Sequence, residues 1–365
     1  MPTGEIIDVL VVDDSAFMRK VISEIVDSDP ALRVIDTARN GCDALACIDR
    51  FHPRVVTLDL EMPVKDGFGV LTELRARKPR QPGPAVIALS SLTQEGSEAS
   101  LRCFDLGCFD VVGKPLSSRA DRMDAVRAEL IAKIKAAAGA PASSSLARPA
   151  PPPTIKALPR PPAPDAPAAE VDGVLVIGAS TGGPRALQSV VPEIDPALVR
   201  LPIVIVQHMP PRFTESLAHR LESLSLHGLR VREAREGDTL RPGLALVAPG
   251  GHHLLFDRNG VAHLSDDPPV HGVRPSVDVT MISLLRRWGD RCVAALLTGM
   301  GKDGAAGMKR IRDAGGLTLA EDESTCVVYG MPRAAVEMDA AQRIVPLPLI
   351  TKNLTEMAEQ LQHER

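Results

Sequence analysis

Short apolar runs alternate with helical patterns along most of this chain. In the first third, runs rich in β-branched residues stand at residues 6–12, 34–37, 55–58, 85–89 and 110–112. Runs without polar alternation are typical of strands that are buried on both faces of a parallel sheet. Helical patterns separate them, most clearly in residues 15–28, where Ser15 is placed as a cap. We therefore expect a doubly wound α/β domain with a sheet of five parallel strands over residues 5–135.

A segment of different composition follows at residues 136–171. Alanine, serine and proline dominate it, and it contains no aromatic residue. Such a segment cannot bury enough apolar surface to offset the entropy that ordering would remove. We expect a flexible Pro/Ala-rich linker, semi-extended where the prolines cluster.

The α/β alternation resumes over residues 172–365. It predicts strands at residues 174–177, 203–206, 244–247, 293–297 and 317–320, and helices at residues 212–225, 276–288 and 304–314. We expect a second doubly wound α/β domain. Ligands of open α/β sheets bind at the carboxyl ends of the strands. Ser180, His208 and Asp303 all fall at such ends.

The overall composition narrows the class of protein. Of 365 residues, 44% are apolar and only 2% are aromatic, so the cores are large and aliphatic. The formal net charge of −4 gives no reason to expect a nucleic-acid surface. The N-terminus has no signal pattern, and no apolar run approaches the roughly 18 residues of a membrane span. We expect a cytoplasmic protein without nucleic-acid binding or membrane insertion.

Two cysteine pairs have a spacing that could suggest a metal site. Cys42 and Cys47, like Cys103 and Cys108, are five residues apart in or near predicted helices. That spacing separates the side chains by roughly 140° around a helix axis, whereas zinc sites use tighter spacings. We expect buried, reduced thiols at these positions.

Polar residues follow four strands of the first predicted sheet. Asp13 and Asp14 end the first strand, Asp59 the third and Ser90 the fourth, and Lys114 follows the fifth. In a parallel sheet these ends converge on one edge. Clustered carboxylates repel one another and favour a hard divalent cation, most plainly Mg²⁺. A lysine and a hydroxyl beside them can hold a phosphoryl group that one carboxylate accepts.

Residues 5–135 resemble the receiver domains of response regulators. The resemblance rests on Val12-Asp13-Asp14-Ser15, Asp59-Leu60-Glu61-Met62-Pro63, Asp66-Gly67, Ser90 and Lys114-Pro115. It implies that Asp59 is the phosphoacceptor. It also implies that Asp13, Asp14 and Asp59 bind the Mg²⁺ needed for phosphorylation. Ser90 and Lys114 would form the phosphate switch.

A glycine turn after the strand at residues 174–177 holds a lone hydroxyl. Gly178, Ser180 and Gly182 fit the G-x-S-x-G elbow, which exposes a serine beside a helix N-terminus. The unpaired N–H groups of that helix end suit an oxyanion. A phosphate-binding turn and a purely structural turn are the alternatives. The dinucleotide fingerprint, however, requires glycine where Ser180 stands.

A nucleophilic serine needs a base and an acid that orients the base. His208 follows an apolar strand and is the first candidate for the base, with His252 and His253 as alternatives. Asp303, in a glycine loop after a strand, is the first candidate for the acid. Asp278 is the rival, although it fits the first turn of a helix better.

Residues 172–350 resemble the catalytic domain of the chemotaxis protein-glutamate methylesterases. The resemblance rests on Gly178-Ala-Ser-Thr-Gly-Gly-Pro184, Gln207-His-Met-Pro210, Phe213-Thr214, Ala248-Pro-Gly-Gly251, Arg274-Pro-Ser-Val-Asp278, Leu297-Thr-Gly-Met-Gly301 and Tyr329-Gly-Met-Pro332. It implies a triad of Ser180 as nucleophile, His208 as base and Asp303 as orienting acid. It also implies an oxyanion hole formed by the N–H groups of Met300 and Thr181.

The two resemblances together imply a signal-controlled hydrolase. Phosphorylation by a chemotaxis histidine kinase would activate hydrolysis of glutamyl methyl esters on methyl-accepting chemoreceptors, and some relatives also deamidate receptor glutamines. We expect Mg²⁺ in the receiver domain and no cofactor in the esterase domain. A binding protein with an inactive hydrolase domain and a nucleotide-binding output domain remain as alternatives.

Overall fold

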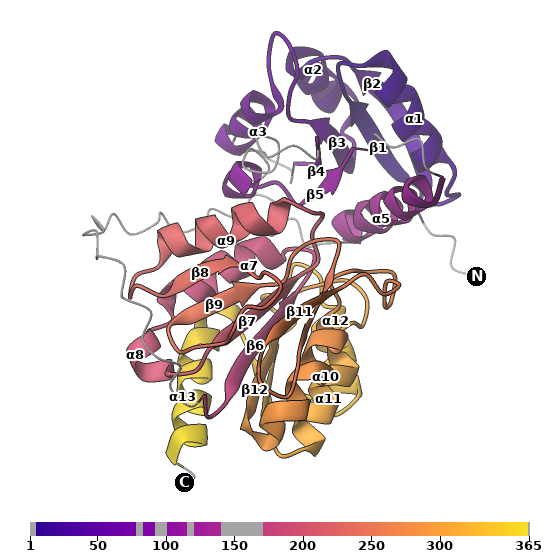
Figure 1. The fold of residues 1–365 in the computed structure, drawn as a ribbon. Coiled ribbons are helices and arrows are strands. Elements are labelled where there is room, and N and C mark those ends of the chain that lie inside the picture. The colour runs from indigo at the N-terminus through magenta and orange to yellow at the C-terminus, as the bar shows by residue number, and fades with distance from the viewer. Residues whose placement is uncertain (1–4, 78–82, 92–100, 115–119, 140–170, 364–365) are drawn as a thin grey trace. The chain divides into compact units, whose positions relative to one another are not determined.

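The computed structural model describes residues 5–77, 83–91, 101–114, 120–139 and 171–363. Its contacts divide the chain into two compact units, Met1–Pro152 and Pro153–Arg365 (Figure 1). Most of the expected linker lies outside the described residues, so its bounds stay a prediction. Residues 136–139, which the sequence placed in the linker, belong to helix α5 (Ala120–Gly139).

The first unit is a five-stranded parallel sheet in the order β2-β1-β3-β4-β5. Its strands are β1 (Ile7–Val12), β2 (Leu32–Ala38), β3 (Val55–Asp59), β4 (Ala85–Ser90) and β5 (Asp110–Gly113). Helices α1 (Ala16–Asp27) and α5 cover one face, and α2 (Gly41–Phe51) and α3 (Gly67–Ala76) the other (Figure 1). All five predicted strands are present, so the doubly wound fold is confirmed. Ser15 caps α1 as expected, since its Oγ accepts the Met18 N–H.

The second unit is a seven-stranded parallel sheet in the order β14-β13-β12-β6-β7-β9-β8. Its strands are β6 (Val174–Ala179), β7 (Ile203–Gln207), β8 (Arg230–Glu233), β9 (Leu244–Val247), β12 (Cys292–Leu296), β13 (Leu317–Glu321) and β14 (Arg343–Val345). An antiparallel hairpin, β10 (His253–Phe256) and β11 (Ala262–Ser265), stands apart from the sheet. The second doubly wound α/β fold is therefore confirmed, with β6 at its centre.

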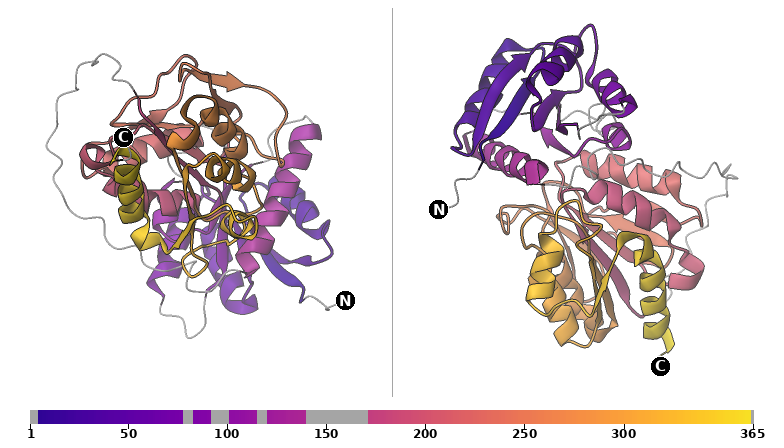
Figure 2. Two further views of the ribbon diagram at one scale, coloured as in Figure 1. Left: turned by 90° about the horizontal axis from the view of Figure 1, so that it is seen from below. Right: turned by 180° about the vertical axis from the view of Figure 1, so that it is seen from behind.

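Helices cover both faces of the second sheet (Figure 2). One group is α7 (Gly183–Val190), α8 (Pro196–Val199), α9 (Phe213–Leu224) and α13 (Ile350–His363), and the other is α10 (Val277–Trp288), α11 (Ala305–Asp313) and α12 (Met331–Glu337). Short 3₁₀ turns are η1 (Val191–Glu193), η2 (Gly289–Arg291) and η3 (Leu347–Leu349). The three helices that the sequence predicted correspond to α9, α10 and α11.

Four strands of the second unit were not predicted from the sequence. β8 and β14 are the edge strands of the sheet, and β10 and β11 form the hairpin. β8 carries three charged residues in four, because an edge strand exposes side chains that a central strand buries. None of the four segments shows the continuous apolar run by which the inner strands were recognised.

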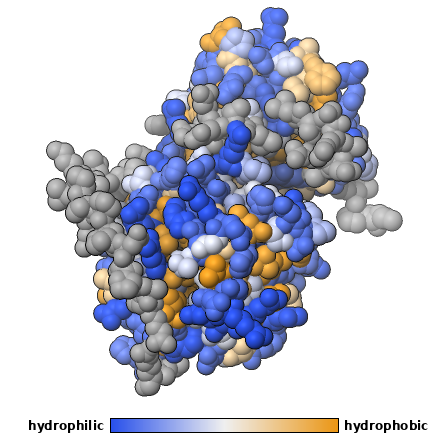
Figure 3. Space-filling view, viewed as in Figure 1, coloured by the Kyte–Doolittle hydropathy of each residue, from blue (hydrophilic) through white to orange (hydrophobic). Residues whose placement is uncertain are grey.

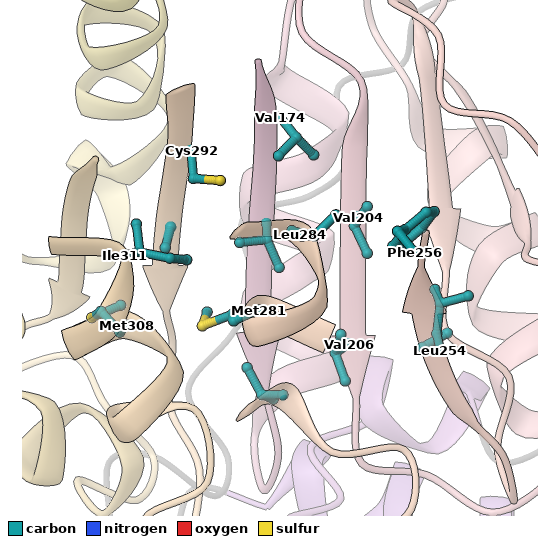
Figure 4. Close-up of a cluster of buried hydrophobic side chains, with 14 of the residues drawn as sticks. Val174, Val204, Val206, Leu254, Phe256, Met281, Leu284, Cys292, Met308 and Ile311 are labelled. Atoms are coloured by element: carbon teal, nitrogen blue, oxygen red, sulfur yellow. The ribbon is translucent and has the colours of Figure 1, made fainter. Parts of the chain in front are cut away.

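An aliphatic core joins the sheet of the second unit to α10, α11 and the hairpin (Figure 4). Val174 and Val204 project from neighbouring strands toward Met281 and Leu284 of α10, and Phe256 of β10 closes one end. Phe256 is the only aromatic residue among those that Figure 4 labels. Full burial of such side chains is worth about 1.5–3 kcal/mol each. This core fixes α10, whose N-terminus lies at the candidate active site.

The surface and the cysteines add two findings. The face shown in Figure 3 is mostly hydrophilic with small separate apolar areas, and no helix within the described ranges is long and apolar enough to cross a membrane.

Cys103 and Cys108 are buried free thiols, as expected. For Cys42 and Cys47 the expected burial is wrong, because α2 turns Cys42 to solvent and leaves Cys47 partly exposed.

Val64 is strained in the loop after β3. Its φ is 71°, and the Lys65 N–H donates to the Pro63 carbonyl at 2.9 Å, which closes a three-residue γ-turn. A β-branched residue is disfavoured in this left-handed region. Val64 is 87% exposed, so it gains almost no packing energy in return.

We therefore expect Val64→Asn to raise the free energy of unfolding of the first unit by about 0.5–1 kcal/mol, because asparagine tolerates a positive φ. Calorimetric unfolding of the whole chain, following the transition of this unit, measures the change. Val64→Ala is the matched control and should stabilise less, since alanine lacks the short polar side chain with which asparagine hydrogen-bonds the local backbone at a positive φ. A lower midpoint for Val64→Asn than for the parent would contradict the strain.

Candidate functional site

The pairing of β6 with β7 brings Ser180 beside His208. The two strands are in register up to Ala179 and Gln207, so the next residue of each leaves the sheet at the same edge. The His208 N–H donates to the Ala179 carbonyl at 3.1 Å, which extends the pairing by one step. The predicted nucleophile and base therefore lie on adjacent strand ends.

The glycines after Ser180 are needed for packing within the protein. Gly182 has a φ of 77°, and a Cβ there would lie 2.5 Å from the Cβ of Val327. A Cβ at Gly183 would overlap the side chain of Gln207. Protein atoms thus occupy the positions where a pyrophosphate would have to approach these glycines. The turn fits a nucleophile elbow between β6 and α7 better than a dinucleotide loop.

His208 and Asp303 form a direct pair. The Nε2 atom of His208 lies 2.8 Å from Oδ2 of Asp303, and both side chains are almost completely buried. Asp303 stands in the loop between β12 and α11, as the glycine pattern of that loop predicted. The geometry is that of a carboxylate that orients an imidazole.

The N-terminus of α10 holds the Asp303 carboxylate in place. Oδ1 accepts the Ser276 hydroxyl at 2.7 Å, and Oδ2 accepts the Val277 N–H at 2.6 Å. Burial by itself would raise the pKa of Asp303. The hydrogen bonds from His208, Ser276 and Val277 outweigh it and hold the pKa below its ordinary value. Asp303 is therefore ionised at neutral pH and can stabilise a protonated His208.

Asp278, the rival acid, contacts a different histidine. It lies in the first turn of α10, as expected, where Oδ1 accepts the Gly307 N–H at 2.6 Å and Oδ2 is 3.2 Å from Nε2 of His271. Burial, and then the nearby charge of Asp303, raise the pKa of Asp278. One ring nitrogen of His271 and one carboxylate oxygen each of Asp278 and Asp303 lie within 4.8 Å of one another, a spacing that could suggest a metal site. Backbone N–H groups point at these oxygens, however, and such donors do not fit a cation.

The other two candidate bases have their own partners. His253 is 1% exposed, its Nδ1 accepts the Ser276 N–H at 3.1 Å, and its Nε2 lies 3.2 Å from the Pro268 carbonyl. Both ring nitrogens are thereby satisfied in the neutral form. His252 is partly exposed and lies 2.8 Å from Asp266. Neither is paired with Asp303 or placed at the end of β7.

The loop after β12 packs directly against the serine. A Cβ at Gly299 would lie 2.8 Å from the Cβ of Ser180. Within the described residues, the backbone N–H groups of Met300 and Thr181 donate to no protein acceptor. Unbonded N–H groups next to a serine can bind an oxyanion. This arrangement fits the oxyanion hole that the resemblance implied.

Two residues that support the serine were missed by the sequence reasoning. Gln207 Nε2 donates to the Ser180 carbonyl at 2.9 Å, and the Thr298 carbonyl accepts the Ser180 N–H at 3.0 Å. Gln207 stands next to His208 in a motif that the sequence reasoning quoted, so its place was a usable signal. Thr298 also stands in a quoted motif, Leu297-Thr-Gly-Met-Gly301, but its contact with Ser180 depends on how β12 pairs with β6.

The predicted polar cluster of the first unit also forms. Lys114 Nζ lies 2.6 Å from Oδ2 of Asp59 and 3.0 Å from Oδ2 of Asp13. Burial raises the pKa of Asp59 to about 6, although Lys114 opposes the shift. Ser90 is buried at the end of β4, and its carbonyl accepts the Lys114 N–H at 2.8 Å. Asp14 is exposed beside them.

The residues of this cluster fit a hard divalent cation. Carboxylate oxygens of Asp13, Asp14 and Asp59 all lie within 4.8 Å of one another. One lysine offsets part of three negative charges, and oxygen ligands are those that Mg²⁺ prefers. The three carboxylates could therefore hold Mg²⁺, which would supply the positive charge needed to bring a phosphoryl group to Asp59.

Comparison with known families matches both units. A family model described as CheB methylesterase matches residues 175–354, and one described as Response regulator receiver domain matches residues 9–126. Each match covers the unit that contains the corresponding cluster of polar residues.

Three relatives align with this chain over nearly the full length of both proteins. A protein-glutamate methylesterase/protein-glutamine glutaminase of Symbiobacterium thermophilum is 50% identical over 362 residues, which cover 96% of each chain. A second such protein, from Pseudomonas aeruginosa, is 45% identical and covers 96% of this chain and 97% of its own. One from Pyrococcus abyssi is 42% identical and covers 98% of this chain and 95% of its own.

We expect Asp14→Asn to remove most of the stabilisation of the first unit by Mg²⁺. A ligand at ten times its Kd stabilises a fold by about 1.4 kcal/mol, a shift of several degrees in Tm. Because Asp14 is exposed, the Tm without Mg²⁺ should hardly change. The parent's shift should shrink below about pH 6, where the Asp59 carboxyl takes up a proton.

Thermal unfolding of the whole chain with and without MgCl₂ measures both effects. Glu24→Gln, an exposed carboxylate on α1, is the control and should keep the full Mg²⁺ response. An undiminished response in Asp14→Asn would exclude Asp14 as a ligand.

Proposed function

Because this chain belongs to the family of protein-glutamate methylesterases/protein-glutamine glutaminases, we propose that it hydrolyses glutamyl methyl esters of chemoreceptors under the control of its own receiver domain. The reaction releases methanol and restores the glutamate carboxylate, which is the chemistry of adaptation in chemotaxis. A chemotaxis histidine kinase donates the phosphoryl group to the receiver. The single observation that carries the proposal is the His208–Asp303 pair at the strand end next to Ser180.

The first half of the reaction acylates the serine. Ser180 Oγ attacks the ester carbonyl carbon while His208 takes the hydroxyl proton. Nε2 of His208 is engaged with Asp303, so the other ring nitrogen accepts that proton. The ionised Asp303 stabilises the imidazolium that results. Collapse of the tetrahedral intermediate breaks the bond to the methoxy oxygen, and His208 returns the proton so that methanol leaves.

The second half restores the enzyme. His208 takes a proton from water, the hydroxide attacks the acyl carbon, and the bond to Ser180 Oγ breaks as His208 reprotonates it. In both halves negative charge develops on the carbonyl oxygen, where the N–H groups of Met300 and Thr181 can meet it. A glutamine side chain follows the same steps with ammonia as the leaving group. One site can therefore perform deamidation as well as ester hydrolysis.

The receiver supplies the control. Asp59 accepts the phosphoryl group as an acyl phosphate. Asp13, Asp14 and Asp59 would hold Mg²⁺, which would supply positive charge there, and Lys114 and Ser90 would contact the phosphoryl oxygens. Lys114 already bridges Asp13 and Asp59, so transfer of a phosphoryl group to Asp59 must change the partners of this lysine. That rearrangement at the end of β5 is the event that signals phosphorylation to the rest of the chain.

We expect Ser180→Ala, His208→Ala and Asp303→Asn each to reduce methanol release by about a thousandfold or more, because the three residues act as a unit. Double variants should be little slower than the slowest single variant. The measurement is release of labelled methanol from methylated receptor by the whole chain.

His252→Ala is the matched control for the base. It removes a partly exposed histidine that pairs with Asp266, so turnover should stay within about twofold of the parent. Near-normal turnover in His208→Ala would refute the assignment of the base. Absence of any turnover in the parent protein would instead favour a binding protein with an inactive hydrolase domain.

We also expect acetyl phosphate with Mg²⁺ to accelerate methanol release by the whole chain by about tenfold, within the usual range of coupling between two sites. Asp59→Ala should abolish the acceleration without abolishing basal turnover. Asp49→Asn, an exposed carboxylate on α2, should respond like the parent. The same acceleration in Asp59→Ala would exclude Asp59 as the phosphoacceptor.

A further inference from the structure

Glu321 is a fully buried carboxyl group behind the candidate active site. It is the last residue of β13 and is 0% exposed. Its Oε2 accepts the Thr298 N–H at 2.8 Å, and its Oε1 accepts the Thr325 hydroxyl at 3.1 Å. The triad chemistry makes no use of this group. Burial of a carboxyl group costs free energy unless hydrogen bonds compensate for it. The groups that bond to Glu321 therefore indicate which part of the structure it stabilises.

Thr298 links Glu321 to the main chain on both sides of the nucleophile. The Thr298 carbonyl accepts the Ser180 N–H at 3.0 Å, and the Thr298 hydroxyl donates to the Thr181 carbonyl at 3.0 Å. The next residue, Gly299, packs against Ser180, and Met300 follows it. The Glu321 carboxyl therefore holds the Thr298 N–H at the start of the loop after β12, and this loop carries Met300, the candidate oxyanion donor.

The same carboxyl reaches a second loop through Thr325. The Val328 N–H donates to the Thr298 hydroxyl at 2.9 Å, and Val327 packs over Gly182. Thr325 also accepts the Leu347 N–H at 2.9 Å, so it anchors the start of this loop. Glu321 thus joins the loop after β12 to the loop that covers the turn after Ser180.

We propose that Glu321 is a positioning residue of the esterase: through Thr298 it sets the distance between the Ser180 hydroxyl and the Met300 N–H. This inference rests on the proposed function of the same site. Glu321 touches no reacting atom. It acts by keeping Thr298 fixed, so its loss affects the transition state, in which the oxyanion needs the donor, more than substrate binding.

The charge state of Glu321 supports this role. Burial raises the pKa of Glu321 to about 7, and the carboxylate of Asp322 adds to the rise. The hydrogen bonds from Thr298, Thr325 and Cys326 lower the pKa, but less than burial raises it. Cys326, the other titratable group in contact, is itself buried, and its thiol pKa is raised. Glu321 is therefore partly protonated at neutral pH, and a neutral carboxyl can still accept the Thr298 N–H.

Ionisation of Glu321 should oppose the reaction. A negative charge in the low-dielectric interior behind the loop repels the oxyanion that forms beside Ser180. Glutamine has the same shape, accepts the Thr298 N–H and carries no charge. Leucine has a similar volume but leaves that N–H without an acceptor. These two substitutions separate the hydrogen bond from the charge.

The test measures kcat and KM for release of methanol by the whole chain from methylated receptor. Glu321→Leu should lower kcat by about 10- to 100-fold with KM changed by less than about twofold. Glu321→Gln should restore kcat at pH 6.5 to within about threefold of the parent. Above pH 7 the kcat of the parent should fall by at least about threefold relative to that of Glu321→Gln.

Thr318→Val is the matched control. Thr318 is buried on the same strand and donates to the Ala340 carbonyl at 2.6 Å, but it has no link to Ser180. This variant should lose stability and keep its kcat. An unchanged kcat in a folded Glu321→Leu would overturn the proposal. If Glu321→Leu does not fold, superimposable kcat–pH profiles for Glu321→Gln and the parent would overturn it.

A second measurement does not depend on turnover. The folded state binds the Glu321 proton more tightly than the unfolded state, whose pKa is near 4.5. Stability from this group is therefore full below pH 4.5, falls as the pH rises to about 7 and is constant above. Glu321→Gln should raise the Tm of the second unit at pH 8.5 more than at pH 5. Equal Tm differences at both values would show that Glu321 is not a titrating buried acid and would overturn its assigned charge effect.

The controls separate this inference from the proposed function. A parent protein without turnover, indistinguishable from Ser180→Ala, means that the proposed function fails. If the parent is active, Ser180→Ala is inactive and Glu321→Leu is fully active, then only the positioning role fails.

Discussion

Parallel pairing of β6 with β7 on one side and β12 on the other is the constraint on which the second unit's site depends. The register aligns Ala179 with Gln207 and Gly178 with Leu296, so three chain segments leave the sheet at one edge. Because side chains alternate between the faces of a strand, a slip of one residue in either pair would turn the polar groups to opposite faces. The aliphatic core in Figure 4 fixes that register, and hence the site, through side chains that take no part in the chemistry.

Three buried carboxyl groups near this edge differ in what stabilises them. Asp303 receives hydrogen bonds from the N-terminus of α10 and from His208, which together overcome the penalty of burial. Asp278, in the first turn of the same helix, receives fewer donors and lies beside the charge of Asp303, so its proton is held more tightly. Glu321 receives hydrogen bonds that lower its pKa, but burial has the larger effect and raises it. The fold therefore lowers the pKa of the acid at the histidine and raises the pKa of the other two carboxyl groups.

The inner strands and the polar residues that follow them could be predicted from the sequence, because burial on both faces leaves a continuous apolar run and the chemistry begins where the run ends. Edge strands such as β8 could not, since exposure permits charged side chains there. The sequence ranked His208 ahead of His253, and the hydrogen-bond partners of the two histidines then distinguish them, since only His208 is paired with Asp303. The burial and the hydrogen-bond partners of Glu321 could not be predicted from the sequence either. Its burial results from contacts between loops far apart in sequence, which no local pattern records.

The two units use the same edge of the same kind of sheet but neutralise charge differently. In the first unit Lys114 is shared between Asp13 and Asp59, an arrangement that a new charge on Asp59 must disturb. In the second unit Asp303 is fixed by backbone N–H groups and by Ser276, which cannot exchange partners without unwinding the start of α10. The first arrangement suits a switch and the second a preorganised catalyst. The His208–Asp303 pair is held by these fixed donors and is therefore a rigid part of the site. Control of such an enzyme has to act on access to Ser180 or on the loops around it.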